Sequence, residues 1–523
     1  MQEPMTEPAC PTRPLQPVFT GISDQIAIHG RFRAQQFAFV EGPRQVTWCE
    51  YNSTANRIAN AMIALGVTPG ARIAVVVSNS LWAHELLLGT WRAGAIFVPL
   101  SPLLSHEALA KMIQDCDASI LFASDEYAAI TQASAGERRV FTQQQFQEHI
   151  RPSSDAAPAI TLAPLDLAVI IYSSGTTGTP KGIAHSHESR LKFGAYFAAE
   201  FRFHCHAKAL SCIPIHSNGA WLSWLPAKWI GATTVILPRF SADDYLRAVE
   251  EHAPTHGFAV PTMAAALLQH PRIEEIGLNC FEALITAGSA MPAGIKQEMQ
   301  RLSGNSLFEL WGLTEGVATL IDPIDMQQRP HSVGRAMLGC DIRLIGPDDG
   351  DITHSGVGEI VGRSAAMMSG YWNRPDANAA VLWHDAHGTA FIRTGDIGAL
   401  DAHGFLILRG RKKDMIVSGG LNVYPIDIET CLLSHEDVLD AAVVGVEHEK
   451  WGEVPVAMVR LKPGTRTDAI TLQDWANGRL AKHQRVQALR VYSQDFPRNT
   501  LGKVLKNQLA EEYRASLHAQ QDR

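Results

Sequence analysis

The sequence lacks several features that would each have indicated a different class of protein. No run of about eighteen apolar residues occurs, so no membrane-spanning helix is expected. The eight cysteines form no CxxC pair, which argues against a disulfide framework and against a zinc site. The net charge of -8 argues against a nucleic-acid-binding protein. Residues 1–17 are polar and rich in proline, without the apolar core of a signal peptide, so we expect a cytoplasmic protein.

The length and the composition indicate a globular enzyme of more than one domain. A chain of 523 residues is too long for a single hydrophobic core. Hydrophobic residues make up 46% and charged residues 19%, as in ordinary globular enzymes.

The first half of the chain alternates between short apolar runs and amphipathic stretches. Strands are predicted at residues 46–51, 72–77 and 96–100, and helices at residues 54–65 and 82–93. The same alternation continues after residue 233. Such alternation is typical of an α/β fold, in which mixed and parallel sheets are covered by helices.

From about Ile342 the pattern changes to short strands and turns. A polar cluster at residues 409–414 lies between two apolar strands, and we place the domain boundary there. The predicted domains are residues 1–409, a large N-terminal unit, and residues 410–523, a small mobile α+β unit of a size that can fold alone.

A loop rich in Ser, Thr and Gly follows the apolar run at residues 167–171, which is predicted to be a buried strand. Glycines allow backbone N–H groups to turn toward an anion, and the hydroxyls and Lys181 add donors and a positive charge. The loop is not a Walker A loop, because its lysine precedes the last glycine. A flexible linker is the alternative, but linkers rarely follow directly after a buried strand. The predicted polyphosphate-binding residues are Ser173, Ser174, Gly175, Thr176, Thr177, Gly178, Thr179 and Lys181.

This loop resembles the phosphate-binding signature of the adenylate-forming superfamily, which includes acyl-CoA synthetases, aryl-acid adenylating enzymes, peptide-synthetase adenylation domains and firefly-type luciferases. Two further segments resemble the superfamily's nucleotide-binding motifs and occur in the expected order. Without the other motifs, the residues of these two segments would be interpreted as ordinary core and turn residues. The resemblance implies nucleotide-binding roles for Gly288, Ser289, Glu309, Leu310, Trp311 and Gly312, with Thr314 as a phosphate donor. It also implies that Glu315 and Thr176 hold Mg²⁺.

The resemblance extends to the end of the chain. Asp396 matches the motif whose aspartate holds the ribose hydroxyls, and Arg411 matches a second ribose contact. Lys413 occupies the hinge position of the family. Ser418, Gly419 and Gly420 match the segment that approaches the reacting centre when the thioester forms.

Lys503 matches the family's catalytic lysine. A carboxylate that attacks the α-phosphate is repelled by it, and a lysine between the two offsets this repulsion. The spacing Pro-x-x-x-x-Gly-Lys from Pro497 also resembles a lysine acetylation site of bacterial acyl-CoA synthetases, and this resemblance implies a lysine acetyltransferase that acts on Lys503 as a partner.

The stretch Pro214 to Gly219 has the Pro-x-His-x-x-Gly arrangement of acyl-CoA and aryl-CoA synthetases, and it places His216 among the catalytic residues. By resemblance, the acyl group lies among residues 216–224, 258–263 and 287–291, which include no charged side chain. A second carboxylate would be buried there without a partner, so a neutral, mostly apolar acid is expected. Trp221, Trp224 and Phe258 suit a ring, but they suit the core equally well.

The resemblance therefore implies an ATP- and Mg²⁺-dependent acid–CoA ligase of two steps, with CoA as co-substrate. The acid is expected to be medium-chain, alicyclic or aromatic. The alternatives are a stand-alone adenylating enzyme that loads a carrier protein and a catalytically inactive binding homologue. Lys503, Glu315 and Asp396 are all present, which argues against the inactive homologue.

Overall fold

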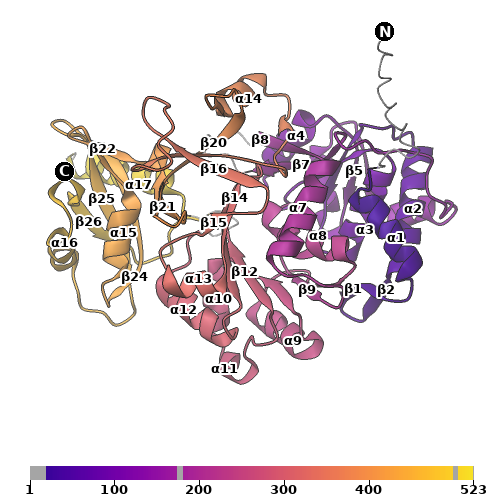
Figure 1. Ribbon diagram of the computed structural model, residues 1–523, viewed down its shortest axis with the longest axis horizontal. Coiled ribbons are helices and arrows are strands. Elements are labelled where there is room, and N and C mark those ends of the chain that lie inside the picture. The colour runs from indigo at the N-terminus through magenta and orange to yellow at the C-terminus, as the bar shows by residue number, and fades with distance from the viewer. Residues whose placement is uncertain (1–18, 174–180, 499–503, 522–523) are drawn as a thin grey trace, which may run out of the picture.

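The computed structural model describes residues 19–173, 181–498 and 504–521, without the side chains of Ser173 and of residues 517–521. Figure 1 shows a large part formed by the earlier residues and a smaller part, orange to yellow, formed by the last ones. The predicted α/β fold class, with a large N-terminal and a small C-terminal domain, is confirmed. The boundary predicted between residues 409 and 410 lies inside strand β21 (Leu406–Arg411) and stays a proposal.

Two large sheets form the N-terminal part. Each has a parallel centre and antiparallel strands at one or both edges. The nine-stranded sheet has the order β15 (Arg335–Ala336), β14 (Ala318–Ile321), β13 (Leu307–Gly312), β12 (Ala283–Ala287), β11 (His256–Phe258), β9 (Lys208–Ser211), β10 (Thr233–Ile236), β1 (Phe37–Glu41), β2 (Arg44–Thr47). The seven-stranded sheet has the order β18 (Gly370–Tyr371), β8 (Lys181–Ser186), β7 (Leu167–Ser173), β4 (Ile96–Pro99), β3 (Arg72–Val76), β5 (Ala118–Ala123), β6 (Arg139–Thr142).

Helices fill the space between these sheets and cover their outer faces (Figure 1). The largest core combines apolar side chains of both sheets with those of α1, α2, α3, α7 and α8. The helices of this part are α1 (Ile22–Phe32), α2 (Trp48–Ala64), α3 (Leu81–Arg92), α4 (His106–Asp115), α5 (Ala128–Ser134), α6 (Gln143–Ile150), α7 (His187–Glu200), α8 (Trp221–Ile230), α9 (Ala242–His252), α10 (Pro261–Leu268), α11 (Ile273–Ile276), α12 (Ala293–Leu302), α13 (Pro323–Gln328) and α14 (Pro375–Val381).

The strand predicted at residues 46–51 is wrong in its last four residues. β2 ends at Thr47, and Trp48 begins helix α2. The Thr47 hydroxyl accepts a hydrogen bond from the backbone N–H of Glu50, and the Glu50 carboxylate accepts one from the backbone N–H of Thr47. This capping box starts a helix despite the β-forming residues that follow it.

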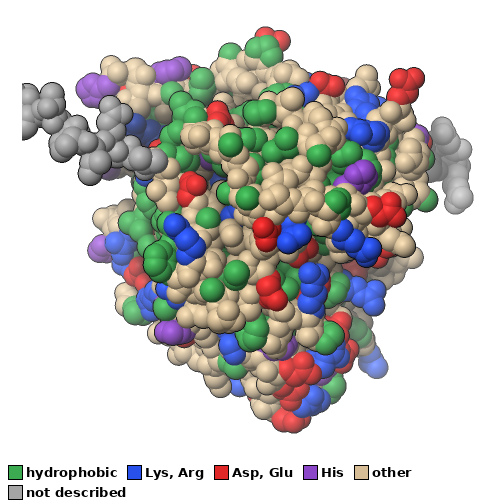
Figure 2. All heavy atoms as spheres, turned by 90° about the vertical axis from the view of Figure 1, so that its right-hand side faces the viewer, with side chains coloured by type: hydrophobic (Ala, Val, Ile, Leu, Met, Phe, Trp, Pro, Cys, Tyr) green, Lys and Arg blue, Asp and Glu red, His purple; other side chains and the backbone are tan. Residues whose placement is uncertain are grey.

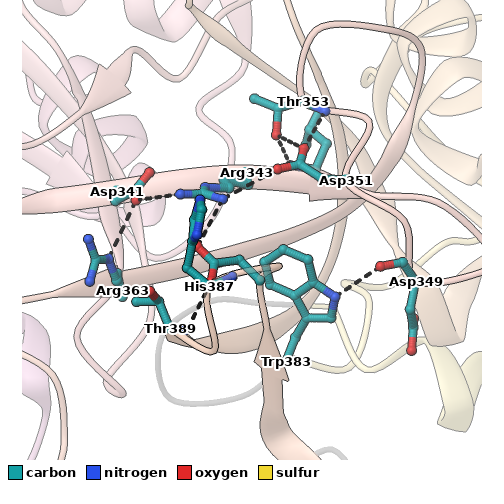
Figure 3. Close-up of polar contacts among 11 residues, drawn as sticks. Asp341, Arg343, Asp349, Asp351, Thr353, Arg363, Trp383, His387 and Thr389 are labelled. Carbon is teal, nitrogen blue, oxygen red and sulfur yellow. Dashed lines mark hydrogen bonds and ion pairs between the residues drawn. The ribbon is translucent and has the colours of Figure 1, made fainter.

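A five-stranded sheet links the large part to the small one. It contains β16 (Cys340–Ile345), β17 (Gly358–Ser364), β20 (Ala390–Leu400) and β19 (Leu382–His384), with β21 paired to β20. Arg343 contacts Asp341 and Asp351 (Figure 3). It also contacts Asp385, and so joins β16 to two turns. This network stabilises the sheet in which Asp396 of β20 pairs with Arg411 at the end of β21.

The C-terminal part has a sheet and cores of its own. The five-stranded sheet has the order β23 (Leu421–Val423), β22 (Ile416–Ser418), β25 (Gly452–Leu461), β24 (Val438–His448), with β26 (Ala488–Val491) paired to β25. Helices α15 (Pro425–Leu433), α16 (Ala469–Asn477) and α17 (Lys506–Gln521) pack on it.

No helix in the described ranges is long and apolar enough to cross a membrane. The face at the right of Figure 1 carries acidic and basic side chains that are mixed with one another (Figure 2).

One buried lysine stands out in the large core. Lys228 of α8 is 1% exposed, and its Nζ lies 4.1 Å from the ring centroid of Phe39 and 3.3 Å from Nδ1 of His84. In the described part of the chain, no carboxylate forms an ion pair with it. Burial therefore lowers the pKa of Lys228 well below its usual value, and burial likewise lowers the pKa of His84.

We expect Lys228→Met to stabilise the protein at neutral pH. The folded protein binds this proton less readily than the unfolded chain, so the amine costs stability at every pH below its unfolded pKa. Replacing the amine by an apolar side chain of similar length removes this cost, which is on the order of 1–3 kcal/mol for buried charges. Thermal unfolding at pH 6, 7 and 9 should show an increase in Tm that grows as the pH falls.

Lys111→Met is the matched control, because Lys111 is exposed on α4. A Tm of the Lys228→Met protein below that of the unmodified protein at pH 6 would contradict the expectation.

Candidate functional site

The predicted phosphate loop lies between two antiparallel strands. Ser173 at the end of β7 pairs with Lys181 at the start of β8, so the two ends of the loop are held side by side. Residues 174–180, and with them the predicted ligands Ser174, Gly175, Thr176, Thr177, Gly178 and Thr179, lie outside the described residues.

Tyr371 connects the end of this loop to the predicted metal ligand. Nζ of Lys181 lies 4.9 Å from the Tyr371 ring centroid, and the Tyr371 hydroxyl donates a hydrogen bond of 2.9 Å to Oε1 of Glu315. Strand β18 brings Tyr371 there by pairing with β8. The sequence analysis missed Tyr371, because it follows no motif and only sheet pairing places it beside Lys181.

Asp396 joins two other predicted nucleotide-binding residues. Its carboxylate accepts a hydrogen bond of 2.9 Å from Nε1 of Trp311 and lies 2.6 Å from Nε of Arg411. The carboxylate side chain is 7% exposed. The structure therefore brings together an indole, a guanidinium and a carboxylate that lie far apart in the sequence.

Glu309, which was predicted to bind the nucleotide, is a buried residue that is paired with a lysine. It is 4% exposed on β13, and Lys296 of α12 forms an ion pair with it. Gly288 and Ser289 follow β12, and Gly288 has a φ of +95° that favours glycine. Leu310 and Gly312 lie near the end of β13, beside a cavity.

This cavity has a volume of about 140 Å³ and opens between helix α7, the turn before α8 and strand β13. Among the described residues that line it, none is charged. They are Phe193, Tyr196, Phe197, Ser217, Asn218, Gly219, Leu222, Phe258, Val260, Ala287, Gly288, Leu310, Gly312, Leu313, Thr314, Gly316, Val317, Ala318, Met337, Leu338, Cys340, Ser364 and Ala366. The predicted phosphate donor Thr314 therefore borders an apolar pocket.

The three aromatic residues that the sequence analysis left open, as ring contacts or as core, differ in their relation to the cavity. Trp221 and Trp224 are fully buried in the core and do not line it, whereas Phe258 does. A dry cavity of about 150 Å³ holds one benzene molecule, so the space suits a single ring. The sequence analysis missed the walls formed by α7 and by Met337, Leu338 and Cys340, since these carry no recognisable motif.

His216 lies next to the cavity in sequence but does not line it. Its Nδ1 is buried and has no hydrogen-bond partner in the described ranges. Burial lowers the pKa of His216 to about 4, so the imidazole is neutral at physiological pH.

The remaining predicted residues belong to the domain boundary and to the C-terminal part. Lys413 lies in a short 3-10 helix (Lys412–Asp414), and its neighbour Lys412 contacts Glu359 at 2.8 Å. Ser418 ends β22, while Gly419 and Gly420 form the turn to β23 with φ values of +58° and +79°. None of the three lines the cavity. Lys503 lies outside the described residues.

Comparison with known families agrees with this arrangement. The family model of AMP-binding enzymes matches residues 27–372. The model of the C-terminal domain of AMP-binding enzymes matches residues 427–503.

Two curated relatives match almost the whole chain. A protein of Mycobacterium tuberculosis named long-chain-fatty-acid–CoA ligase FadD13 is 30% identical over 491 residues, which cover 92% of this chain and 96% of the relative. The indoleacetate–CoA ligase of Aromatoleum aromaticum is 31% identical over 501 residues, with 93% and 97% covered.

Solved structures match equally well. The ATP-bound MatB of Rhodopseudomonas palustris has a TM-score of 0.87 and 27% identity, and 94% of this chain and 99% of that chain are covered. The o-succinylbenzoate CoA synthetase MenE of Bacillus subtilis, in complex with its acyl-adenylate, has a TM-score of 0.82, 26% identity, and 93% and 97% covered.

We expect Asp396→Asn to weaken nucleotide binding. The amide group presents a donor to either Trp311 or Arg411, and it carries no charge for a nucleotide hydroxyl to donate to. The loss of charge-assisted hydrogen bonds should lower the affinity for AMP or ATP by about 10- to 100-fold. Calorimetric titration of both proteins with AMP or ATP measures this change in affinity.

Asp385→Asn is the matched control, since the Asp385 side chain is 5% exposed in the turn after β19 and pairs with Arg343 of the same sheet at 3.3 Å. Equal losses of affinity in the two variants would mean that Asp396 acts only through the stability of the sheet.

Proposed function

This chain belongs to the family of AMP-binding enzymes, and we propose from that premise that it activates a neutral acid with one ring or a medium-length chain. It is an AMP-forming acid–CoA ligase, which converts a carboxylate, ATP and CoA to acyl-CoA, AMP and pyrophosphate. The relatives are named as CoA ligases, so loading of a carrier protein is not favoured.

The observation that carries the choice of acid is the uncharged cavity beside Thr314. An acid whose tail fills the cavity would present its carboxylate at this threonine, where nucleotide and acyl sites meet. The hydroxyl of Thr314 is then available to donate to the phosphate. A second carboxylate in the cavity would lose its hydration without gaining a cationic partner.

The nucleotide would be held by the residues that converge on Asp396 and by the loop at residues 173–181. The Asp396 carboxylate would accept from the ribose hydroxyls, with Arg411 beside it, and Trp311 would pack against the base. Lys181, which lies over the Tyr371 ring, would contribute positive charge to the phosphates.

Glu315 fits a magnesium ligand. Tyr371 occupies its Oε1, while in the described ranges Oε2 has no recorded partner. One carboxylate oxygen together with substrate phosphates is the arrangement that Mg²⁺ prefers. The ion would neutralise phosphate charge. Thr176, the second proposed ligand, lies outside the described residues.

The small domain is proposed to rotate about Lys413 between the two half-reactions. Adenylation would then use Lys503, and thioester formation would use Ser418, Gly419 and Gly420. Glycines at the last two positions leave room for a pantetheine arm near the backbone. A cytoplasmic location belongs to the same proposal, since all seven described cysteines are free.

A panel of acids with ATP and CoA tests the proposal. We expect phenylacetate, cyclohexanecarboxylate and hexanoate to form thioesters, and malonate and succinate to be at least about 100-fold poorer in kcat/KM, because a buried unpaired carboxylate costs several kcal/mol. Pyrophosphate release without CoA is measured in parallel. Efficient use of malonate would refute the proposed acid class, and adenylation without any transfer to CoA would support carrier loading.

Lys503→Ala should separate the two half-reactions. Loss of one positioned electrostatic donor typically costs about 100- to 1,000-fold, so acid-dependent pyrophosphate release should fall by that amount. Thioester formation from supplied acyl-adenylate and CoA should persist. Acetylation of Lys503 by a lysine acetyltransferase would have the same effect, because it removes the same charge.

Lys506→Ala is the control for this experiment, as Lys506 pairs with Glu429 at 2.6 Å. It should leave pyrophosphate release within a few-fold of normal. An equal fall in both half-reactions of the Lys503→Ala protein would contradict the division of roles.

A further inference from the structure

Arg190 is a buried cation without a counter-ion beside the cavity. It lies on α7 and is 1% exposed, and no carboxylate in the described part of the chain forms an ion pair with it. Its guanidinium carbon lies 4.6 Å from the ring centroid of Phe193 and 5.6 Å from that of Trp221. Burial lowers the pKa of Arg190 to about 9, so the group still carries its charge at neutral pH.

Two polar side chains contact this guanidinium. Nη1 donates a hydrogen bond of 3.2 Å to Oδ1 of Asn218, and Nη2 donates one of 3.0 Å to Nδ1 of His185. Arginine can only donate hydrogen bonds, so it accepts only one orientation of the Asn218 amide. With Oδ1 directed at Arg190, the two N–H donors of Asn218 remain for another acceptor.

No acceptor for those N–H donors is recorded among the residues that the structure describes. Asn218 is partly exposed and lines the cavity, next to Ser217, whose Oγ is buried without a hydrogen-bond partner. A ligand that fills the cavity removes water from the Asn218 amide, and a donor that loses its water without gaining an acceptor is costly, so a ligand that supplies an acceptor is favoured. Other residues that line the cavity, among them Phe193, Val260 and Met337, are apolar.

We propose that Arg190 fixes Asn218 as a hydrogen-bond donor toward the acyl group, so that the enzyme selects ring acids that carry a neutral acceptor oxygen. This rests on the proposed function and specifies the substrate class of the same cavity. Arg190 is a positioning residue, since it does not line the cavity, and Asn218 is the residue that selects. A carboxylate in place of the neutral oxygen is disfavoured, because the guanidinium is enclosed and cannot approach it.

The experiment compares acids of equal shape. Cyclohexylacetate is tested against its three tetrahydropyranyl analogues, in which one ring methylene at the 2-, 3- or 4-position is replaced by an ether oxygen. For each protein, kcat/KM for thioester formation is measured with every acid, and the ratio of ether to carbocycle is formed. A general loss of activity in a variant cancels in this ratio.

For at least one isomer, the ratio in the unmodified enzyme should exceed that in Asn218→Leu by about three- to tenfold, the effect of one neutral hydrogen bond. Asn218→Asp keeps an acceptor for Arg190 but removes the donor, so its ratio should fall at least as far. Arg190→Met frees the Asn218 amide to rotate, and the ratio in this variant should lie between those of the unmodified enzyme and of Asn218→Leu. A role of Arg190 in stability alone would not change the ratio.

Two outcomes would overturn the inference, and they are distinguishable. Ratios that are the same in the unmodified enzyme and in Asn218→Leu for all three isomers would show that Asn218 does not select. If the unmodified enzyme forms no thioester from any of these four acids, the proposed ring-acid substrate class is itself wrong, and the inference falls with it.

Discussion

The carboxylate of Asp396 is the contact on which the organisation of the site depends. It accepts from Trp311 on β13 and from Arg411 on β21, and so connects the nine-stranded sheet to the sheet that leads into the C-terminal part. A buried carboxylate is stable only where donors surround it. The requirement to satisfy this one charge therefore aligns three segments of the chain around one point, at which a nucleotide would be held.

The cavity shares a wall with these segments. Leu310, Gly312 and Thr314 follow one another from β13 into its turn, and all three line the cavity. A short stretch of chain thus separates a region of charge and hydrogen bonds from an uncharged pocket. This arrangement suits a reaction that joins a charged phosphate to the one charged group of an otherwise apolar acid. The phosphate then stays among charged and hydrogen-bonding groups, and the apolar tail stays in the uncharged cavity.

The contacts between the two parts of the molecule are of a different kind. Arg409 lies 3.5 Å from Asp427 of α15, with both side chains partly exposed. An exposed ion pair of this kind contributes about 0–1 kcal/mol. The ion pair of Lys412 with the buried Glu359 precedes Lys413 in the chain, so a rotation about Lys413 leaves it in place. The C-terminal part has separate hydrophobic cores, so a change in its orientation would break few strong interactions. The proposed rotation about Lys413 is compatible with both facts.

By itself, the sequence determined the fold class and the order of the nucleotide motifs, because alternating strands and helices and short motifs are local patterns. The helix start at Trp48 shows the limit of such reasoning, since the capping box of Thr47 and Glu50 outweighs β-forming residues. Only the tertiary structure decided that Trp221 and Trp224 are core residues and that α7 forms a wall of the cavity. Only it placed Tyr371 between Lys181 and Glu315, and Arg190 against Asn218. These contacts join residues from different elements, and their existence depends on how strands pair and helices pack, which no local pattern in the chain encodes.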